Sequence, residues 1–176
     1  WIVGDATIDK SETGTSFKQA LYFKDIGFNL YDTMIYRKSN RPPLNHKRYG
    51  QEFEYMFVLS KGSPNTINLI QTQCITAGKI NKGTMRNGGS DVLSRKHGEG
   101  LVVRDQKPLG NIWTYAVGVE KDNCGRHPAI FPEKLAEDHI ISCSKEGDIV
   151  LDPMAGSGTT LKMAKKHNRN YIGIEI

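Results

Sequence analysis

A glycine-containing segment between an apolar run and a predicted helix is the part of this sequence best suited to ligand binding. The segment reads Asp-Pro-Met-Ala-Gly-Ser-Gly-Thr-Thr over residues 152–160 and continues the apolar run 148–152. At the amino end of a helix, unpaired backbone N–H groups and the helix dipole favour an anionic or strongly polar ligand. Gly156 and Gly158 carry no side chain, so the backbone can approach that ligand closely.

Glu175 supplies the second part of the predicted site. It stands 23 residues after Asp152, at the end of the next predicted strand. An acid in that place can accept hydrogen bonds from both hydroxyl groups of a ribose. The loop and the acid together predict a cofactor that contains adenosine.

Two other nucleotide sites fit these residues less well. A P-loop needs a lysine after its last glycine, whereas Thr159 follows Gly158, so no lysine reaches a phosphate. A dinucleotide site needs a third glycine, and Leu161 stands at that position. A P-loop is therefore excluded, and a dinucleotide site is disfavoured.

The residues around the loop predict the elements that position it. A helix over 158–167 and a strand over 171–176 make a βαβ unit with the apolar run 148–152. Ahead of them, Pro132 at a first helical position predicts a helix that ends near Gly147. The apolar side of that helix would carry Leu135, Ala136, Ile140 and Cys143.

The first 61 residues predict a second group of elements. Residues 1–3 are the end of an apolar strand, and β-rich runs cover 28–36 and 53–59. Ser16 and Gln19 have the spacing of a capping box, which predicts that a helix starts there. Its inner face would hold Phe17, Ala20 and Leu21, and its C-cap would be Gly27.

The composition is that of a globular protein. Hydrophobic residues make up 38% and charged residues 24% of the 176 residues, and no window approaches the roughly 20 apolar residues of a membrane span. We therefore expect neither a membrane protein nor a targeting peptide. Cys74, Cys124 and Cys143 form no Cys-x-x-Cys pair and have no histidine at ligand spacing, so we expect buried thiols in a reducing compartment and no metal site.

The net charge of +5 is concentrated in residues 62–126, where nine basic residues meet five acidic ones. The same stretch holds ten of the 18 glycines and predicts loops with short strands, such as 101–104. A basic, glycine-rich surface suits contact with a phosphate backbone. An ordinary solvated loop region has the same composition, and charge alone favours that interpretation.

The order of three segments makes the prediction specific. His-Pro-Ala-Ile-Phe-Pro-Glu-Lys-Leu (127–135) precedes the glycine loop, which precedes Tyr-Ile-Gly-Ile-Glu (171–175). This arrangement resembles the amino-methylating DNA methyltransferases in their permuted β class, with the catalytic half first, the recognition region next and the cofactor half last. The resemblance covers the whole chain.

The resemblance implies a fold, a cofactor and a set of site residues. The fold would be α/β, a Rossmann-like methyltransferase core with an incomplete sheet and a loop-rich basic insertion. The domains would be part of the catalytic half (1–61), a target-recognition insertion (62–126) and the cofactor-binding half (127–176). S-adenosylmethionine would be bound by His127, Pro128, Phe131, Asp152, Pro153, Met154, Ala155, Gly156, Ser157, Gly158, Thr159, Thr160 and Glu175. Met154 stands where the family usually has Phe.

The expected partner is double-stranded DNA, methylated at adenine N6 or cytosine N4, in the cytoplasm of a bacterium or from a phage gene. The residues expected to contact DNA are Lys82, Arg86, Arg95, Lys96 and Arg104. Arginine can bind guanine O6 and N7 with two hydrogen bonds, whereas most lysines only contact phosphate. A homodimer of the full-length enzyme is left open.

The family's reaction centre is absent from these residues. It consists of Asp, Asn or Ser followed by Pro-Pro and an aromatic, and it holds a flipped-out base. The Pro-Pro pair of this sequence, Pro42–Pro43, lies between Arg41 and Leu44, so no catalytic residue is assigned. We expect an internal fragment of a longer methyltransferase that is inactive alone.

The sequence is compatible with three alternatives. The catalytic half could lie on a separate polypeptide, or the protein could be a non-catalytic nucleic-acid-binding protein that retains the methyltransferase fold. A small-molecule or RNA methyltransferase is disfavoured by the permuted order and the basic insertion.

Overall fold

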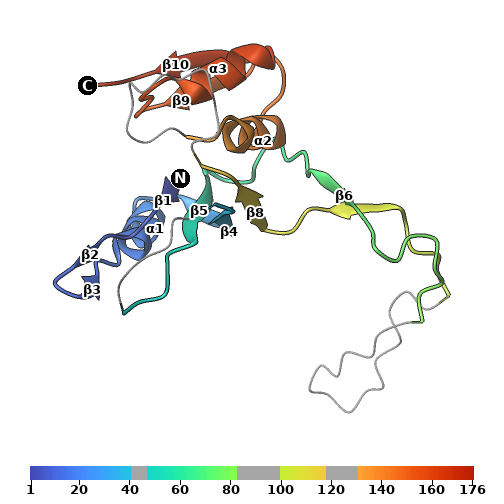
Figure 1. Cartoon of the computed structure of the whole chain (residues 1–176). Coiled ribbons are helices and arrows are strands. Elements are labelled where there is room, and N and C mark those ends of the chain that lie inside the picture. The colour runs from blue at the N-terminus through green and yellow to red at the C-terminus, as the bar shows by residue number, and fades with distance from the viewer. Residues whose placement is uncertain (41–46, 83–99, 118–130) are drawn as a thin grey trace. The chain divides into compact units, whose positions relative to one another are not determined.

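The computed structural model describes residues 1–40, 47–82, 100–117 and 131–176 (Figure 1). The chain divides into two compact units. Unit 1 comprises residues 1–68 and 110–176, and unit 2 comprises residues 69–109. Among the described residues, no helix is long and apolar enough to cross a membrane.

A four-stranded mixed sheet forms the larger part of unit 1. Its strands lie in the order β1 (Ile2–Val3), β5 (Phe53–Ser60), β4 (Asn29–Lys38) and β8 (Ile112–Tyr115). β5 is antiparallel to both β1 and β4, and β8 is parallel to β4. The predicted strands at 1–3, 28–36 and 53–59 are therefore confirmed, with ends that shift by one or two residues.

Helices cover both faces of this sheet. α1 (Thr15–Asp25) packs on one face, where the rings of Phe17 and Tyr55 have centroids 5.2 Å apart. α2 (Glu133–Cys143) packs on the other face, where the His139 ring lies 4.9 Å from that of Trp113. Burial on both faces explains why β5 is apolar almost throughout instead of alternating.

The predicted βαβ unit is confirmed. β9 (Ile149–Asp152) and β10 (Asn170–Gly173) are parallel, and α3 (Thr159–Lys166) connects them. α2 and α3 share a buried apolar cluster, against which Phe131 and Val150 pack. The members of the cluster are Ala136, Ile140, Met163 and Ala164.

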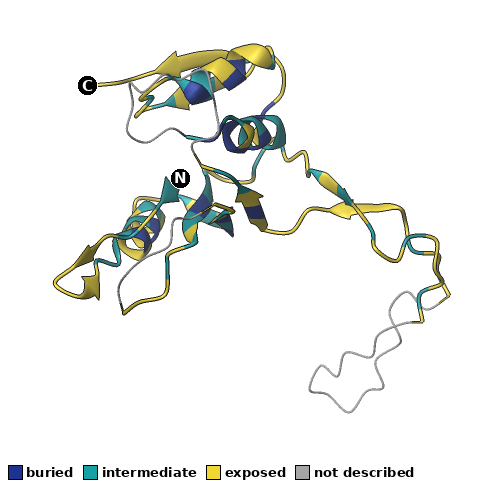
Figure 2. Cartoon of the chain, in the orientation of Figure 1, coloured by how far each residue is buried: buried dark blue, intermediate teal, exposed yellow. Residues whose placement is uncertain are grey.

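The opposite face of the β9–β10 pair is uncovered in the part of the chain that the structure describes. Four apolar side chains on it are half or more exposed, namely Ile149, Leu151, Ile172 and Ile174. Figure 2 shows β10 coloured as exposed along its length. Parallel sheets are normally buried on both faces. The sheet is thus incomplete, as the sequence predicted.

The capping box predicted at Ser16 and Gln19 is wrong. The N-cap of α1 is Gly14, two residues before the predicted one, and the Gln19 side chain accepts a hydrogen bond from Trp1 Nε1 (2.7 Å). The Asp5 carboxylate instead accepts hydrogen bonds from the backbone N–H and the hydroxyl of Ser16. Those hydrogen bonds lower the pKa of Asp5 below its usual value. They also close the loop that contains the short hairpin β2 (Thr7–Ile8) and β3 (Ser11–Glu12).

Other sequence predictions differ in detail. Phe17 and Leu21 are more than half exposed, and the buried residues of α1 are Ser16 and Ala20. Pro132 is the N-cap of α2 and not its first helical residue. Cys143 is exposed on the last turn of α2, and Cys74 is half-buried, while Cys124 lies outside the described residues.

Unit 2 is an extended antiparallel arm. β6 (Gln71–Gln73) pairs with β7 (Gln106–Pro108), and an isolated bridge joins Ile80 to Val102. The strand predicted over 101–104 is therefore reduced to that single bridge. Across 69–82 and 100–109 there is no helix and no buried residue, so hydrogen bonds carry most of the order of this arm.

Gly173 makes the packing of α3 on β10 possible, and its replacement tests that contact. An added Cβ would overlap Leu161 Cδ1 and would lie 3.2 Å from Ala155 Cβ. We expect Gly173→Ala to lower the free energy of unfolding of the full-length protein by about 1–3 kcal/mol, because Leu161 must leave its position. Gly110→Ala is the matched control, since nothing lies within 4 Å of its added Cβ. Equal denaturant midpoints for the two variants would contradict the prediction.

Candidate cofactor site

The glycine loop leaves the carboxyl end of β9 and turns into α3. Asp152 Oδ1 accepts the N–H of Met154 (3.1 Å), and the carbonyl of Ala155 accepts the N–H of Gly158 (2.8 Å). Gly156 has φ 51° and Gly158 has φ 82°, which are left-handed values that favour glycine. Local hydrogen bonds and two glycines therefore give this loop its shape.

The glycine loop is hydrogen-bonded to the residues that follow β10. Backbone hydrogen bonds of 2.9 Å run from Ile174 N–H to the Asp152 carbonyl and from Ala155 N–H to the Ile174 carbonyl. One step further, Glu175 Oε2 accepts the N–H of Gly156 (2.6 Å). The structure thus brings Glu175 to the glycine loop, across 19 residues of sequence.

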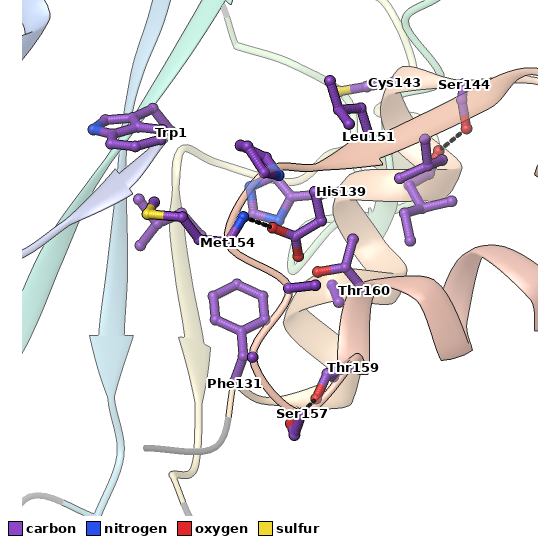
Figure 3. Close-up of a pocket in the computed structure, with 18 of the residues that line it drawn as sticks. Trp1, Phe131, His139, Cys143, Ser144, Leu151, Met154, Ser157, Thr159 and Thr160 are labelled. Carbon is purple, nitrogen blue, oxygen red and sulfur yellow. Dashed lines mark hydrogen bonds between the residues drawn. The ribbon is translucent and has the colours of Figure 1, made fainter. Parts of the chain in front are cut away.

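A cavity of about 630 Å³ opens beside the loop (Figure 3). Its walls are mostly apolar, and Figure 3 shows Phe131 and Met154 facing it. Of the residues predicted to bind the cofactor, it is lined by Phe131, Asp152, Pro153, Met154, Ala155, Gly156, Ser157, Thr159 and Thr160. Gly158 and Glu175 do not line it, and His127 and Pro128 lie outside the described residues.

The cavity also has walls that the sequence did not predict. Trp1 and Ile2 contribute from the start of the chain and β1, and His139 and Cys143 contribute from α2. His139 Nδ1 lies 2.8 Å from the Leu135 carbonyl, and burial lowers the pKa of His139. The ring is therefore neutral at pH 7, and its Nδ1–H donates a hydrogen bond to the Leu135 carbonyl. The apolar side of α2 was the sequence signal that its residues could line a cavity. Nothing in the sequence indicated that β1 lies on the other side of that cavity.

Ion pairs join α2 to α3. Glu133 pairs with Lys162 (2.5 Å) and Glu137 pairs with Lys166 (2.9 Å). His167 Nε2 also lies 2.6 Å from Glu137 Oε1. Hydrogen bonds from Lys166 and His167 lower the pKa of Glu137 to about 2, so this carboxylate stays charged at neutral pH. Glu133 and Glu137 are four residues apart, as are Lys162 and Lys166. This matched spacing places each pair on one side of its helix and was the sequence signal for these ion pairs.

α2 is also joined to the four-stranded sheet. The Tyr115 hydroxyl donates to Asp138 Oδ2 (2.7 Å), and Lys134 Nζ lies 2.8 Å from Asp138 Oδ1. Burial and the adjacent carboxylate raise the pKa of Tyr115 above its usual value, so the phenol stays protonated and remains the donor. α2 is thereby attached to the four-stranded sheet as well as to α3.

The residues predicted to contact DNA are only partly described. Lys82 and Arg104 are exposed on unit 2, as is Lys107. Arg86, Arg95 and Lys96 lie outside the described residues. No group of three or more histidine, cysteine, aspartate or glutamate side chains that could hold a metal ion occurs in the described ranges.

The arrangement suits a ligand with one polar end and one planar apolar part. The N–H groups in the first turn of α3 have no acceptor within the helix. The Glu175 carboxylate can accept hydrogen bonds from hydroxyl groups, and the cavity walls are mostly apolar. Nothing lies within 4 Å of a Cβ built on Gly158, so the backbone there is open to a ligand. These features and the βαβ topology define a Rossmann-like methyltransferase core.

Comparison with known proteins gives the family. The model of the N6/N4 methyltransferase family, described as DNA methylase, matches residues 1–176. The chain is also 51% identical over 186 residues to the orphan methyltransferase M.BamHII of Bacillus amyloliquefaciens, which covers all of this chain and 68% of that protein. This chain belongs to the N6/N4 DNA methylase family.

Two solved structures and a shorter match agree with this assignment. The PvuII DNA methyltransferase (cytosine-N4-specific) shares the fold, with a TM-score of 0.72 and 17% identity over 99% of this chain and 57% of that one. The M1.HpyAVI–SAM complex has a TM-score of 0.54 and 25% identity over 94% and 64%. The DNA adenine methyltransferase YhdJ of Escherichia coli (strain K12) is 46% identical over 72 residues, which are 40% of this chain and 24% of that protein. The chain thus spans about three fifths of the solved structures it matches.

Proposed function

We propose that the full-length protein transfers a methyl group from S-adenosylmethionine to the exocyclic amine of adenine (N6) or cytosine (N4) in double-stranded DNA. The observation that carries the proposal is the glycine loop at the end of β9 with Glu175 fastened to it through Gly156 N–H (2.6 Å). Family membership and the complex of M1.HpyAVI with SAM support the same cofactor. When bound, the cofactor supplies an electrophilic methyl group.

The residues of this chain would divide the work of holding that cofactor. The Glu175 carboxylate would accept the ribose hydroxyls, while Gly156 and Gly158 would let the backbone approach closely. Phe131 and Met154 would provide apolar walls. His127 and Pro128 would complete the site from the segment before α2. The groups bind and orient, which is where most of the rate of such a transfer arises.

Glu175→Gln tests the cofactor site. The amide removes the negative charge that accepts both ribose hydroxyls, so we expect the affinity of the full-length protein for S-adenosylmethionine to fall about 10- to 100-fold. Isothermal titration calorimetry measures this change. Glu146→Gln is the matched control, because Glu146 is an exposed acid between α2 and β9. Equal affinities of the two variants would remove Glu175 from the site.

For DNA binding we propose the exposed cations of unit 2, Lys82 and Arg104, with Arg86, Arg95 and Lys96 on the same segment of sequence. Each phosphate that a cation neutralises releases counterions, so binding must weaken as salt rises. The basic excess of residues 62–126 supports this assignment.

Replacing Arg104 with Ala tests the DNA surface. We expect the affinity of the full-length protein for duplex DNA to fall about three- to tenfold, with a smaller salt slope if Arg104 contacts phosphate. Fluorescence anisotropy at several salt concentrations measures both quantities. Lys145→Ala removes an exposed cation from unit 1 and is the control. Unchanged affinity and slope would exclude Arg104 from the contact surface.

Methyl transfer further requires the family's Asp/Asn/Ser-Pro-Pro-aromatic tetrapeptide, which these 176 residues do not contain. We propose that it lies on additional polypeptide that pairs with an open edge of β1 or β9, because each of these strands has one partner strand among the described residues. A methylation assay should therefore detect no product with residues 1–176 alone, and clear product there would refute the assignment.

A non-catalytic nucleic-acid-binding protein with the same fold is the second candidate, because the basic excess of residues 62–126 suits nucleic-acid contact whether or not a methyl group is transferred. Methylation of duplex DNA by the full-length protein decides for the enzyme, and cofactor-independent DNA binding without methylation decides for the scaffold. For the enzyme we propose a bacterial or phage modification system acting in the cytoplasm. Light scattering of the full-length protein would decide between a monomer and a homodimer.

A further inference from the structure

Two ionic connections join α2 to α3 within unit 1. The first joins Glu133, the first residue of α2, to Lys162 near the start of α3 (2.5 Å). The second lies one turn further along both helices and joins Glu137 to Lys166 (2.9 Å). The pairs follow the same order along the two helices, so the beginning of α2 lies beside the beginning of α3.

The Glu137 carboxylate is the centre of the second connection. Its Oε1 accepts from Lys166 Nζ and lies 2.6 Å from His167 Nε2, while Oε2 lies 3.1 Å from Lys134 Nζ. The Glu137 side chain is only 15% exposed, so water and salt screen these contacts less than those of a fully exposed pair. One carboxylate thus binds cations of both helices at once.

The two joined helices carry different walls of the cofactor cavity (Figure 3). Phe131, two residues before α2, lines it, and Thr159 and Thr160 line it from the first turn of α3, directly after the glycine loop. Glu137 itself does not line the cavity, and neither does Lys166. An effect of Glu137 on the cofactor must therefore pass through the positions of the two helices.

The apolar contact between α2 and α3 leaves their relative position weakly defined. It consists of small or flexible side chains, namely Ala136, Ile140, Met163 and Ala164. Apolar burial is non-directional, and methionine adapts its shape to its surroundings. Charge-assisted hydrogen bonds have a defined geometry. They can therefore fix how far one helix has moved along the other.

We propose that Glu137 is a positioning residue for S-adenosylmethionine, because its carboxylate fixes α2 relative to α3 and so sets how far Phe131 stands from the glycine loop. The inference rests on the proposed cofactor site at that loop. Walls that are fixed before binding lower the conformational freedom that binding must remove. Without the carboxylate the apolar cluster would keep the helices packed, but their relative position would vary.

Glu137→Gln in the full-length protein tests the inference, since it removes the charge and keeps the length of the side chain. We expect the affinity for S-adenosylmethionine, measured by isothermal titration calorimetry, to fall about three- to tenfold. Lys166→Gln should cause a smaller loss, because Glu137 keeps its contacts with Lys134 and His167. In the double variant the second substitution should add less than about twofold, because both act on one connection.

Tyr115→Phe is the matched control. It removes another hydrogen bond of α2, the one to Asp138 (2.7 Å), keeps the ring and leaves the contacts with α3 in place. We expect its affinity for S-adenosylmethionine to stay within twofold of wild type. A loss equal to that of Glu137→Gln would overturn the inference, because general loosening of α2 would then explain both results.

Hydrogen exchange separates positioning from a loss of overall stability. In the absence of ligand, the amides of residues 153–160 should exchange faster in Glu137→Gln than in wild type, while those of β4 and β5 stay unchanged. Unchanged affinity in Glu137→Gln, or a lower affinity with unchanged exchange in 153–160, would overturn the inference. If Glu137→Gln does not fold, Lys166→Gln decides by the same criteria, since Lys166 is exposed. Wild-type protein that binds no S-adenosylmethionine would instead refute the proposed cofactor site.

Discussion

The placement of α2 is the constraint on which the rest of unit 1 depends. Its apolar side is buried against α3 and β9 through Ala136 and Ile140, its acids pair with lysines of α3, and Asp138 binds the sheet through Tyr115. Apolar burial supplies most of the free energy that holds α2 in place, while hydrogen bonds and ion pairs mainly fix the orientation of the helix. Loss of α2 would separate the βαβ unit from the four-stranded sheet.

The glycine loop is ordered by different means. Its hydrogen bonds run to the chain after β10 and not to α2, and Gly173 lets α3 lie close enough to that chain for the loop to reach Glu175. The shape of the loop therefore depends on β10 and the residues after it, and not on hydrogen bonds to α2.

The elements that periodicity specifies were predictable, whereas the contacts between them were not. The βαβ unit could be predicted because the run 148–152 and the glycines after it are local signals. The start of α1 could not, because the donors of Ser16 go to Asp5, eleven residues away, and no local rule contains that pairing. Glu175 could be predicted from its spacing of 23 residues from Asp152, at the end of the next strand. Trp1 and His139 could not be predicted as cavity residues, because their place depends on how distant elements pack. Arg86, Arg95 and Lys96 remain predictions.

The parallel pairing of β4 and β8 has a consequence for how this protein can change. Because β5 is antiparallel to β4 and β8 is parallel to it, β5 ends at the edge of the sheet where β8 begins, and unit 2 occupies the connection from β5 to β8. Its two chain ends already meet at Ile70 and Leu109, so lengthening or replacing the residues beyond them changes neither the strand register nor the closure of the loop by much. A change in the length of unit 2 is therefore compatible with the same strand pairing in unit 1.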